Sequence, residues 1–151
     1  MNKYLELKKR QQEEFQSLPI VYAFGKEQFK KAMAKLGLTE NDMDKVCSIY
    51  GCGNIMLKSD VPKLKEMSHK HNKELKDAIA GDKTGDGFIY DMFDAELSNH
   101  EYGYTQDPTD ALNALGLNLE NVFADERLLK GFQRACREQT QWFEKNNSAA
   151  V

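Results

Sequence analysis

An aspartate-rich stretch in the middle of the chain carries the clearest chemical signal. The stretch DKTGDGFI matches the start of an EF-hand calcium loop, with Asp82, Thr84 and Asp86 at oxygen-donating positions. Phe93 stands where a calcium loop has its bidentate glutamate, so a site here would have few oxygens and little charge. The stretch predicts either a calcium-binding module at residues 82–93 or a glycine-rich turn between two helices, with Asp86 near a helix start.

Acidic residues at helical spacing follow this loop. Asp91 and Asp94 are three residues apart, and Glu96 and His100 are four apart, so each pair shares one helix face. Enzymes built as helical bundles use such residues to hold divalent metals, with matching acids from a second helix. Acids that could match lie near Asp125. A metal-dependent nucleotide phosphohydrolase is therefore an alternative to ordinary surface carboxylates with a helix-capping Asp125.

The chain shows no arrangement of nucleophile and base, and we expect no catalytic residues. Its three cysteines include no Cys-x-x-Cys pair, which argues against a disulfide framework or a zinc knuckle. The first residues have no apolar leader core, and no run of 18 apolar residues occurs. We expect a cytoplasmic protein that does not bind membranes and that needs no cofactor, calcium being the one alternative.

Helices and strands that would position these residues follow from periodicity and from turn residues. Helical patterns cover residues 3–17, 26–36, 59–80, 88–100, 107–116 and 125–145, and residues 102–104 break the pattern. Strand-like runs cover residues 20–24, 46–50 and 54–57, and the last two flank Gly51-Cys52-Gly53 as a β-hairpin. The sequence therefore predicts a mostly helical α+β fold with a small antiparallel sheet of two or three strands. We expect one domain over residues 1–145 and a flexible C-terminal tail over residues 146–151.

Charge is distributed unevenly along the 151 residues. The chain has 21 Lys and Arg against 24 Asp and Glu, and 40% of its residues are hydrophobic, which excludes collagen-like, low-complexity and membrane-spanning classes. Residues 84–126 hold ten acidic residues and no Lys or Arg. Such a segment repels phosphates, so we expect it not to bind nucleic acid.

The acidic segment is also rich in aromatic residues, and this combination suits a basic protein partner. Carboxylates steer the encounter, and Tyr side chains supply contact area that loses its water. The candidate partner-binding residues are Asp86, Tyr90, Asp91, Asp94, Glu101, Tyr102, Tyr104 and Asp107. The competing interpretation is a solvated acidic face whose aromatic residues all belong to the core.

Three stretches of the sequence are similar to a known group of proteins. They are MNKYLELKKRQQ at the start, DKTGDGFIYDMF followed by NHEY in the middle, and DERLL at residues 125–129. They resemble a family of short uncharacterised proteins from Gram-positive gut bacteria and their phages. The resemblance implies a small cytosolic protein carried on mobile elements. Short phage proteins of this kind often block a host defence nuclease or sequester its signal.

Together these features favour a non-enzymatic binding protein. We expect a phage or mobile-element inhibitor of a bacterial defence system, similar in role to an anti-CRISPR protein. Its acidic aromatic face would dock on a basic surface, such as that of a nucleic-acid-binding defence protein. The alternatives are the calcium module, the phosphohydrolase, and a small-ligand sponge for a nucleotide signal, for which the sequence offers no specific site.

Overall fold

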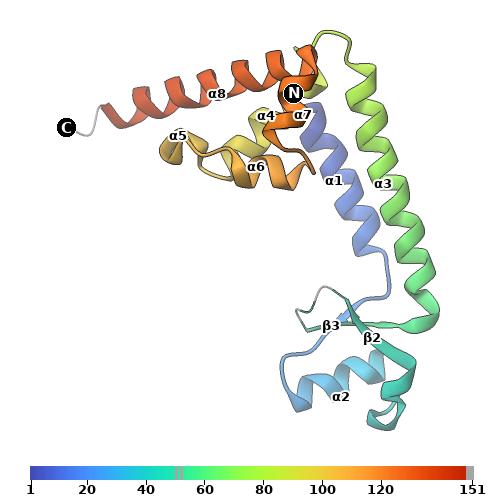
Figure 1. Ribbon diagram of the computed structural model, residues 1–151. Coiled ribbons are helices and arrows are strands. Elements are labelled where there is room, and N and C mark those ends of the chain that lie inside the picture. Colours follow the sequence, from blue (N-terminus) through green and yellow to red (C-terminus); the bar gives the residue numbers. More distant parts are fainter. Residues whose placement is uncertain (50, 52, 149–151) are drawn as a thin grey trace. The chain divides into compact units, whose positions relative to one another are not determined.

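The computed structural model of the protein describes residues 1–49, 51 and 53–148. The chain is mostly helical with one small antiparallel sheet, which confirms the predicted α+β class (Figure 1). The α-helices are α1 (Lys3–Gln16), α2 (Lys26–Lys35), α3 (Val61–Gly81), α4 (Phe88–Asn99), α5 (Tyr102–Thr105), α6 (Thr109–Ala114), α7 (Leu119–Ala124) and α8 (Glu126–Asn147). The strands are β1 (Val21–Tyr22), β2 (Val46–Ile49) and β3 (Asn54–Leu57), and 3-10 turns span Glu40–Lys45 and Lys58–Asp60.

Two compact units make up the chain. We call residues 1–9 and 74–151 the helical unit, and residues 10–73 the sheet unit. The helices α1 and α3 each contribute residues to both units. The expectation of a single domain over residues 1–145 stays a prediction.

A hydrophobic core organises the helical unit. Its fully buried side chains include Tyr4 from α1, several from α4 and Val122 from α7. The rings of Phe93 and Phe132 meet edge-on with centroids 5.3 Å apart, which joins α4 to α8. Some aromatic residues of the acidic segment therefore belong to the core, since Phe88 and Phe93 are buried in it.

Two glycines let neighbouring helices approach α8 closely. A Cβ atom at Gly131 of α8 would stand 2.7 Å from the carbonyl oxygen of Gly85 and 2.7 Å from a methyl group of Ile89. A Cβ atom at Gly103 of α5 would stand 2.8 Å from the Cβ atom of Phe143. These approaches place the acidic segment against α8, and α8 contacts α4, α5 and α7 (Figure 1).

The sheet unit holds the three strands in the order β1-β3-β2, all antiparallel. Val46 pairs with Leu57 and Ile49 with Asn54, which confirms the predicted β-hairpin. The strand β1 covers Val21–Tyr22 and is therefore shorter than the predicted run over residues 20–24. Tyr50 and Cys52, predicted to lie in the hairpin, and residues 149–151 of the predicted tail are outside the described residues.

An ionic cluster joins α1 to α3 within the sheet unit. The carboxylate of Glu14 lies 2.9 Å from the His71 ring and 3.0 Å from the Lys70 ammonium group. Hydrogen bonds from His71 and then Lys70 lower the pKa of Glu14 to about 2. The cluster therefore stabilises the charged form of this carboxylate.

Three local features differ from the sequence-based prediction. Residues 102–105 form a short helical turn, since Glu101 and Gln106 on either side adopt left-handed backbone angles, with φ of 55° and 56°. The helix α7 was not predicted as a separate element. The side-chain oxygen of Asn118 caps it by accepting a hydrogen bond from the backbone N–H of Asn121. A 3-10 turn over Lys58–Asp60 precedes α3, so the α-helix begins two residues later than the predicted range of 59–80.

Candidate docking surface

The loop before α4 is built around the carboxylate of Asp82. Its Oδ1 accepts hydrogen bonds from the backbone N–H groups of Thr84 and Gly85, and its Oδ2 accepts from those of Gly87 and Ile89. Burial opposes ionisation here, but these four hydrogen bonds outweigh it and lower the pKa of Asp82 to about 2. Asp82 thus anchors the loop and ties it to the start of α4.

This geometry gives calcium binding no support. Both oxygens of Asp82 are occupied by backbone donors, and the Thr84 hydroxyl donates to the same carboxylate. Asp86 points to α8, where the Lys130 ammonium group lies 2.6 Å from its Oδ2. Within residues 1–49, 51 and 53–148, no three His, Cys, Asp or Glu side chains gather as a metal-binding group.

The helical carboxylates considered for a metal enzyme each have a different partner. Asp91 accepts from the backbone N–H of Lys3, and Asp94 accepts from the Gln139 amide. Glu96 accepts from the Tyr4 hydroxyl on α1. The Asp125 carboxylate caps α8, as expected, and also pairs with Arg127 at 2.9 Å. The structure therefore gives these acids separate partners, and they form no metal-binding group among the described residues.

The first part of the acidic segment is neutralised by basic residues of α8. Besides its contact with Lys130, Asp86 lies 3.8 Å from the guanidinium group of Arg134. That group also covers the Tyr90 ring, 3.9 Å from its centroid, and contacts Glu138 at 3.1 Å. The Tyr90 hydroxyl donates to Glu138. Burial and this hydrogen bond both raise the pKa of Tyr90. We call this group of five residues the paired end of the segment.

The middle of the segment, at residues 101–107, is more open to solvent. Glu101 and Asp107 are exposed, and the Tyr104 side chain is 74% exposed. Asp107 accepts from the Thr109 amide at the start of α6. Tyr102 is half-buried, and burial together with a hydrogen bond to the Cys136 thiol raises its pKa to about 12. Some of the eight candidate partner-binding residues therefore contact side chains of α8, whereas others are exposed to solvent.

A groove of about 510 Å³ lies at this open part, between α4, α5 and α8. It is lined by Ser98, Glu101, Gly103, Tyr104, Gln139, Trp142 and Phe143. The Tyr104 and Phe143 rings contact each other with centroids 5.9 Å apart, and Trp142, the only tryptophan of the chain, is 64% exposed. We call Glu101, Tyr104 and Trp142 the open end.

Sequence reasoning missed the contribution of α8 to this groove. Phe143 continues the apolar stripe of α8, whereas the neighbouring Trp142 lies outside it. A large aromatic residue beside an apolar stripe, near the end of a long helix, is the signal that could have revealed the groove. Among the described residues that line it, Glu101 alone is charged, so the groove is apolar with an acidic margin.

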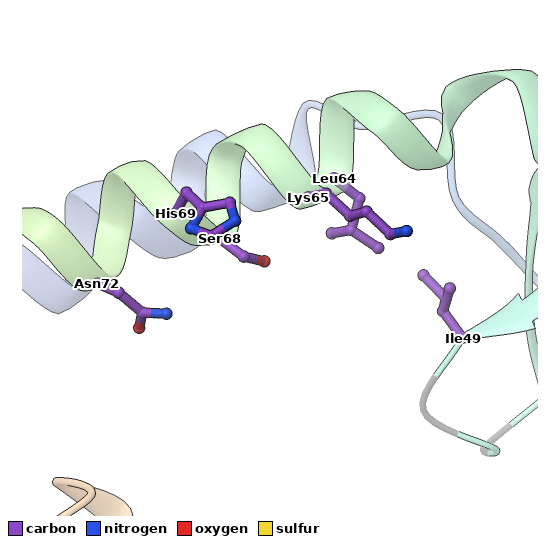
Figure 2. A pocket seen from close by; sticks show the side chains of 6 residues that line it. All are labelled: Ile49, Leu64, Lys65, Ser68, His69 and Asn72. Carbon is purple, nitrogen blue, oxygen red and sulfur yellow. The ribbon is translucent and has the colours of Figure 1, made fainter.

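The sheet unit has a shallow depression of about 320 Å³ along α3 (Figure 2). Figure 2 shows Lys65, His69 and Asn72 along one side of α3, with Ile49 at the end of β2 near Leu64. The three polar side chains are all exposed. Exposed polar residues on one helix face are usual at a protein surface, so we assign no chemistry to this depression.

Comparison with known proteins assigns the sequence to a family, but that family has no known activity. A model described as "Family of unknown function (DUF7659)" matches residues 3–138. No curated protein and no solved structure matches the chain. In the part of the chain that the structure describes, no helix has the length and apolar character required to cross a membrane.

Proposed function

The chain belongs to this family of unknown function, and we propose that it is a non-enzymatic protein that binds a basic protein partner through its open end. The supporting observation is the groove beside Tyr104 and Trp142, where two exposed aromatic side chains lie next to a carboxylate. Large aromatic side chains supply much of the binding energy at protein interfaces when a partner removes their water.

Charge complementarity supports a basic partner. No Lys or Arg lines the groove, and Glu101 forms no ion pair among the described residues. The neighbouring Asp107 is also exposed. An acidic margin of this kind accelerates association with a positively charged surface and repels an acidic one.

The class of partner that we propose is a nucleic-acid-binding protein of a bacterial defence system. Such a protein has a basic surface for phosphates, and an acidic aromatic face that covers it competes with nucleic acid. This assignment depends on the sequence resemblance to proteins of bacteria and their phages. The chain would then act stoichiometrically, as an inhibitor from a mobile element.

Affinity capture with matched variants tests this proposal. The intact chain and a Tyr104→Ala/Trp142→Ala variant serve as baits in a lysate of Gram-positive bacteria, with quantitative mass spectrometry of the captured proteins. Phe123→Ala is the control, because Phe123 is 63% exposed but does not line the groove. We expect a basic protein that the intact chain and the control capture and that the double variant does not. A set of captured proteins that is identical for all three baits would refute the proposal.

A further inference from the structure

The paired end shows how this chain holds a guanidinium group. The central carbon of the Arg134 guanidinium lies 3.9 Å from the centroid of the Tyr90 ring, and its Nε lies 3.1 Å from the Glu138 carboxylate. The face of an aromatic ring attracts a cation, and a carboxylate beside the ring pairs with the same charge. A tyrosine next to a glutamate is therefore a combination that binds arginine within this protein.

The open end has the same combination with more aromatic surface. Glu101 and Tyr104 line the groove together with Trp142 and Phe143 of α8. Tyr104 and Trp142 are exposed, and Phe143 is half-buried. No Lys or Arg among the described residues lines the groove. The aromatic faces and the carboxylate are therefore accessible to a cation from another molecule.

Close packing against α8 holds the α5 side of this groove in place (Figure 1). A Cβ atom at Gly103 would stand 2.8 Å from the Cβ atom of Phe143 and 3.0 Å from the carbonyl oxygen of Gln139. After the end of α5, the side-chain amide of Gln106 donates to the Thr140 hydroxyl over 3.1 Å. Contacts that exist before binding reduce the ordering that a ligand has to impose, and this favours affinity.

The chemistry of the groove favours a guanidinium group over other cations. A guanidinium group is planar and weakly hydrated, so it can stack on an aromatic ring and pair with a carboxylate at the same time. The ammonium group of lysine is compact and strongly hydrated, so it loses more when it leaves water. The groove volume of about 510 Å³ lies within the range of about 300–1,000 Å³ usual for ligand pockets, which gives one side chain room.

We propose that the open end binds an arginine side chain of the partner, with the guanidinium group over the aromatic rings and beside the Glu101 carboxylate. This inference rests on the proposed function, because the arginine belongs to the basic partner, and it names the group that the groove recognises. Arginine is common on surfaces that bind phosphates, so it suits a nucleic-acid-binding partner. One arginine is only part of an interface, and a short arginine peptide should therefore bind in the millimolar range.

An NMR titration of the isotope-labelled full chain with short peptides tests this contact without the partner. Trp142 is the only tryptophan, so its indole N–H group gives a single reporter signal. The probes are acetyl-Gly-Arg-Gly-amide, the same peptide with lysine, and the same peptide with citrulline, whose urea group is uncharged. We expect the arginine peptide to shift the Trp142 signal saturably. The lysine peptide should bind about threefold more weakly, and the citrulline peptide about tenfold more weakly.

Three results would overturn the inference. The first is an unchanged Trp142 signal at high millimolar concentrations of the arginine peptide. The second is equal binding of the arginine and citrulline peptides, since the charge would then not be recognised. The third is tighter binding of tetramethylammonium than of the arginine peptide, which would assign the groove to a small quaternary ammonium compound.

The capture experiment fails independently of this titration. A captured basic partner together with no binding of the arginine peptide would refute only the arginine contact. Binding of the arginine peptide together with identical captures by all baits would support the arginine site and refute only the partner.

Matched variants that keep Trp142 as the reporter separate the charge from the ring. Glu101→Gln should weaken binding of the arginine peptide about threefold and leave the citrulline peptide unchanged. Glu120→Gln is the control, an exposed acid of α7 that does not line the groove, and should change neither. Tyr104→Phe keeps the ring and should bind within about twofold of the intact chain, whereas Tyr104→Leu should bind about threefold more weakly. Equal binding by all four variants would contradict the proposed contact.

Discussion

The paired end and the open end each include residues of the same acidic segment, yet these residues have different surroundings. At the paired end, Lys130 and Arg134 of α8 neutralise Asp86. At the open end, no cation of the described residues pairs with Glu101, and α8 instead contributes Trp142 to the groove. One helix therefore neutralises the first part of the segment and adds an aromatic side chain beside its middle part.

This difference shows that a charge run in the sequence does not define a charged surface. The segment from residue 84 to residue 126 contains no Lys or Arg, but packing brings cations to it from outside its own limits. We expect changes at the paired end and at Asp82 to alter stability. Changes at the open end should alter partner binding and leave stability nearly constant.

The largest expected effect is the loss of the loop anchor beside the paired end. Asp82→Ala removes the acceptor of four backbone N–H groups, so we expect the free energy of unfolding to fall by about 3 kcal/mol. Urea unfolding followed by circular dichroism measures this. Asp110→Ala is the control, since Asp110 is exposed, and should change stability by about 0.5 kcal/mol or less. Equal effects of the two substitutions would contradict the anchoring role.

The same carboxylate makes stability depend on pH. The pKa of Asp82 falls from an ordinary 3.8 to about 2 in the folded chain. Its stabilising contribution is therefore fully present above pH 3.8 and is lost as the pH falls toward 2. Acid titration of unfolding should show a smaller decrease over this range for Asp82→Asn than for the intact chain. An identical pH profile would show that the carboxylate is not specifically stabilised.

At the open end, the largest effect should be on affinity. For the partner identified by capture, Trp142→Ala should weaken binding about 30-fold, the magnitude typical of an aromatic residue at the centre of an interface. Because Trp142 is 64% exposed, its removal should change the unfolding free energy by about 0.5 kcal/mol or less. Calorimetry and urea unfolding measure the two quantities. A large loss of stability together with unchanged affinity would reverse our assignment.

A smaller effect is expected for the cation that covers Tyr90. Arg134→Ala removes the contact with the Tyr90 ring and the hydrogen bond to Glu138, which should lower stability by about 1 kcal/mol. A double-mutant cycle with Tyr90→Leu should give a coupling energy of about 0.5 kcal/mol or more. Strict additivity of the two substitutions would indicate that the ring contact contributes nothing.

The smallest effect should come from Lys130. Its side chain is 57% exposed, and exposed ion pairs contribute little, so Lys130→Ala should lower stability by about 0.5 kcal/mol or less. Thermal unfolding at low and high salt measures this difference. A loss above about 1 kcal/mol would mean that the paired end depends on this ion pair more than its exposure indicates.

Helix and strand positions were well predicted because they depend on local patterns. The apolar spacing of α8 and the β-branched run before Gly51 are visible in the sequence, and both elements are present in the structure. The helical turn at Tyr102 was missed because it is set by left-handed residues on both sides and by close contact of Gly103 with α8. Such contacts join residues that are distant in sequence.

The candidate site was predicted only in part for the same reason. Glu101 and Tyr104 lie at the groove, as the acidic aromatic pattern favours. That Asp86 is neutralised by α8 depends on tertiary packing, which composition does not describe. Asp82 was identified from its motif, but its oxygens bind backbone amides of its own loop.

Salt dependence of partner binding for two matched charge removals tests the central claim most directly. Glu101→Gln and Asp86→Asn each remove one negative charge, the first from the open end and the second from the paired end. We predict that Glu101→Gln weakens binding about threefold or more at low salt and reduces its dependence on ionic strength, whereas Asp86→Asn leaves both within about twofold. Equal effects of the two substitutions, or a larger effect of Asp86→Asn, would contradict the assignment of the open end as the docking surface.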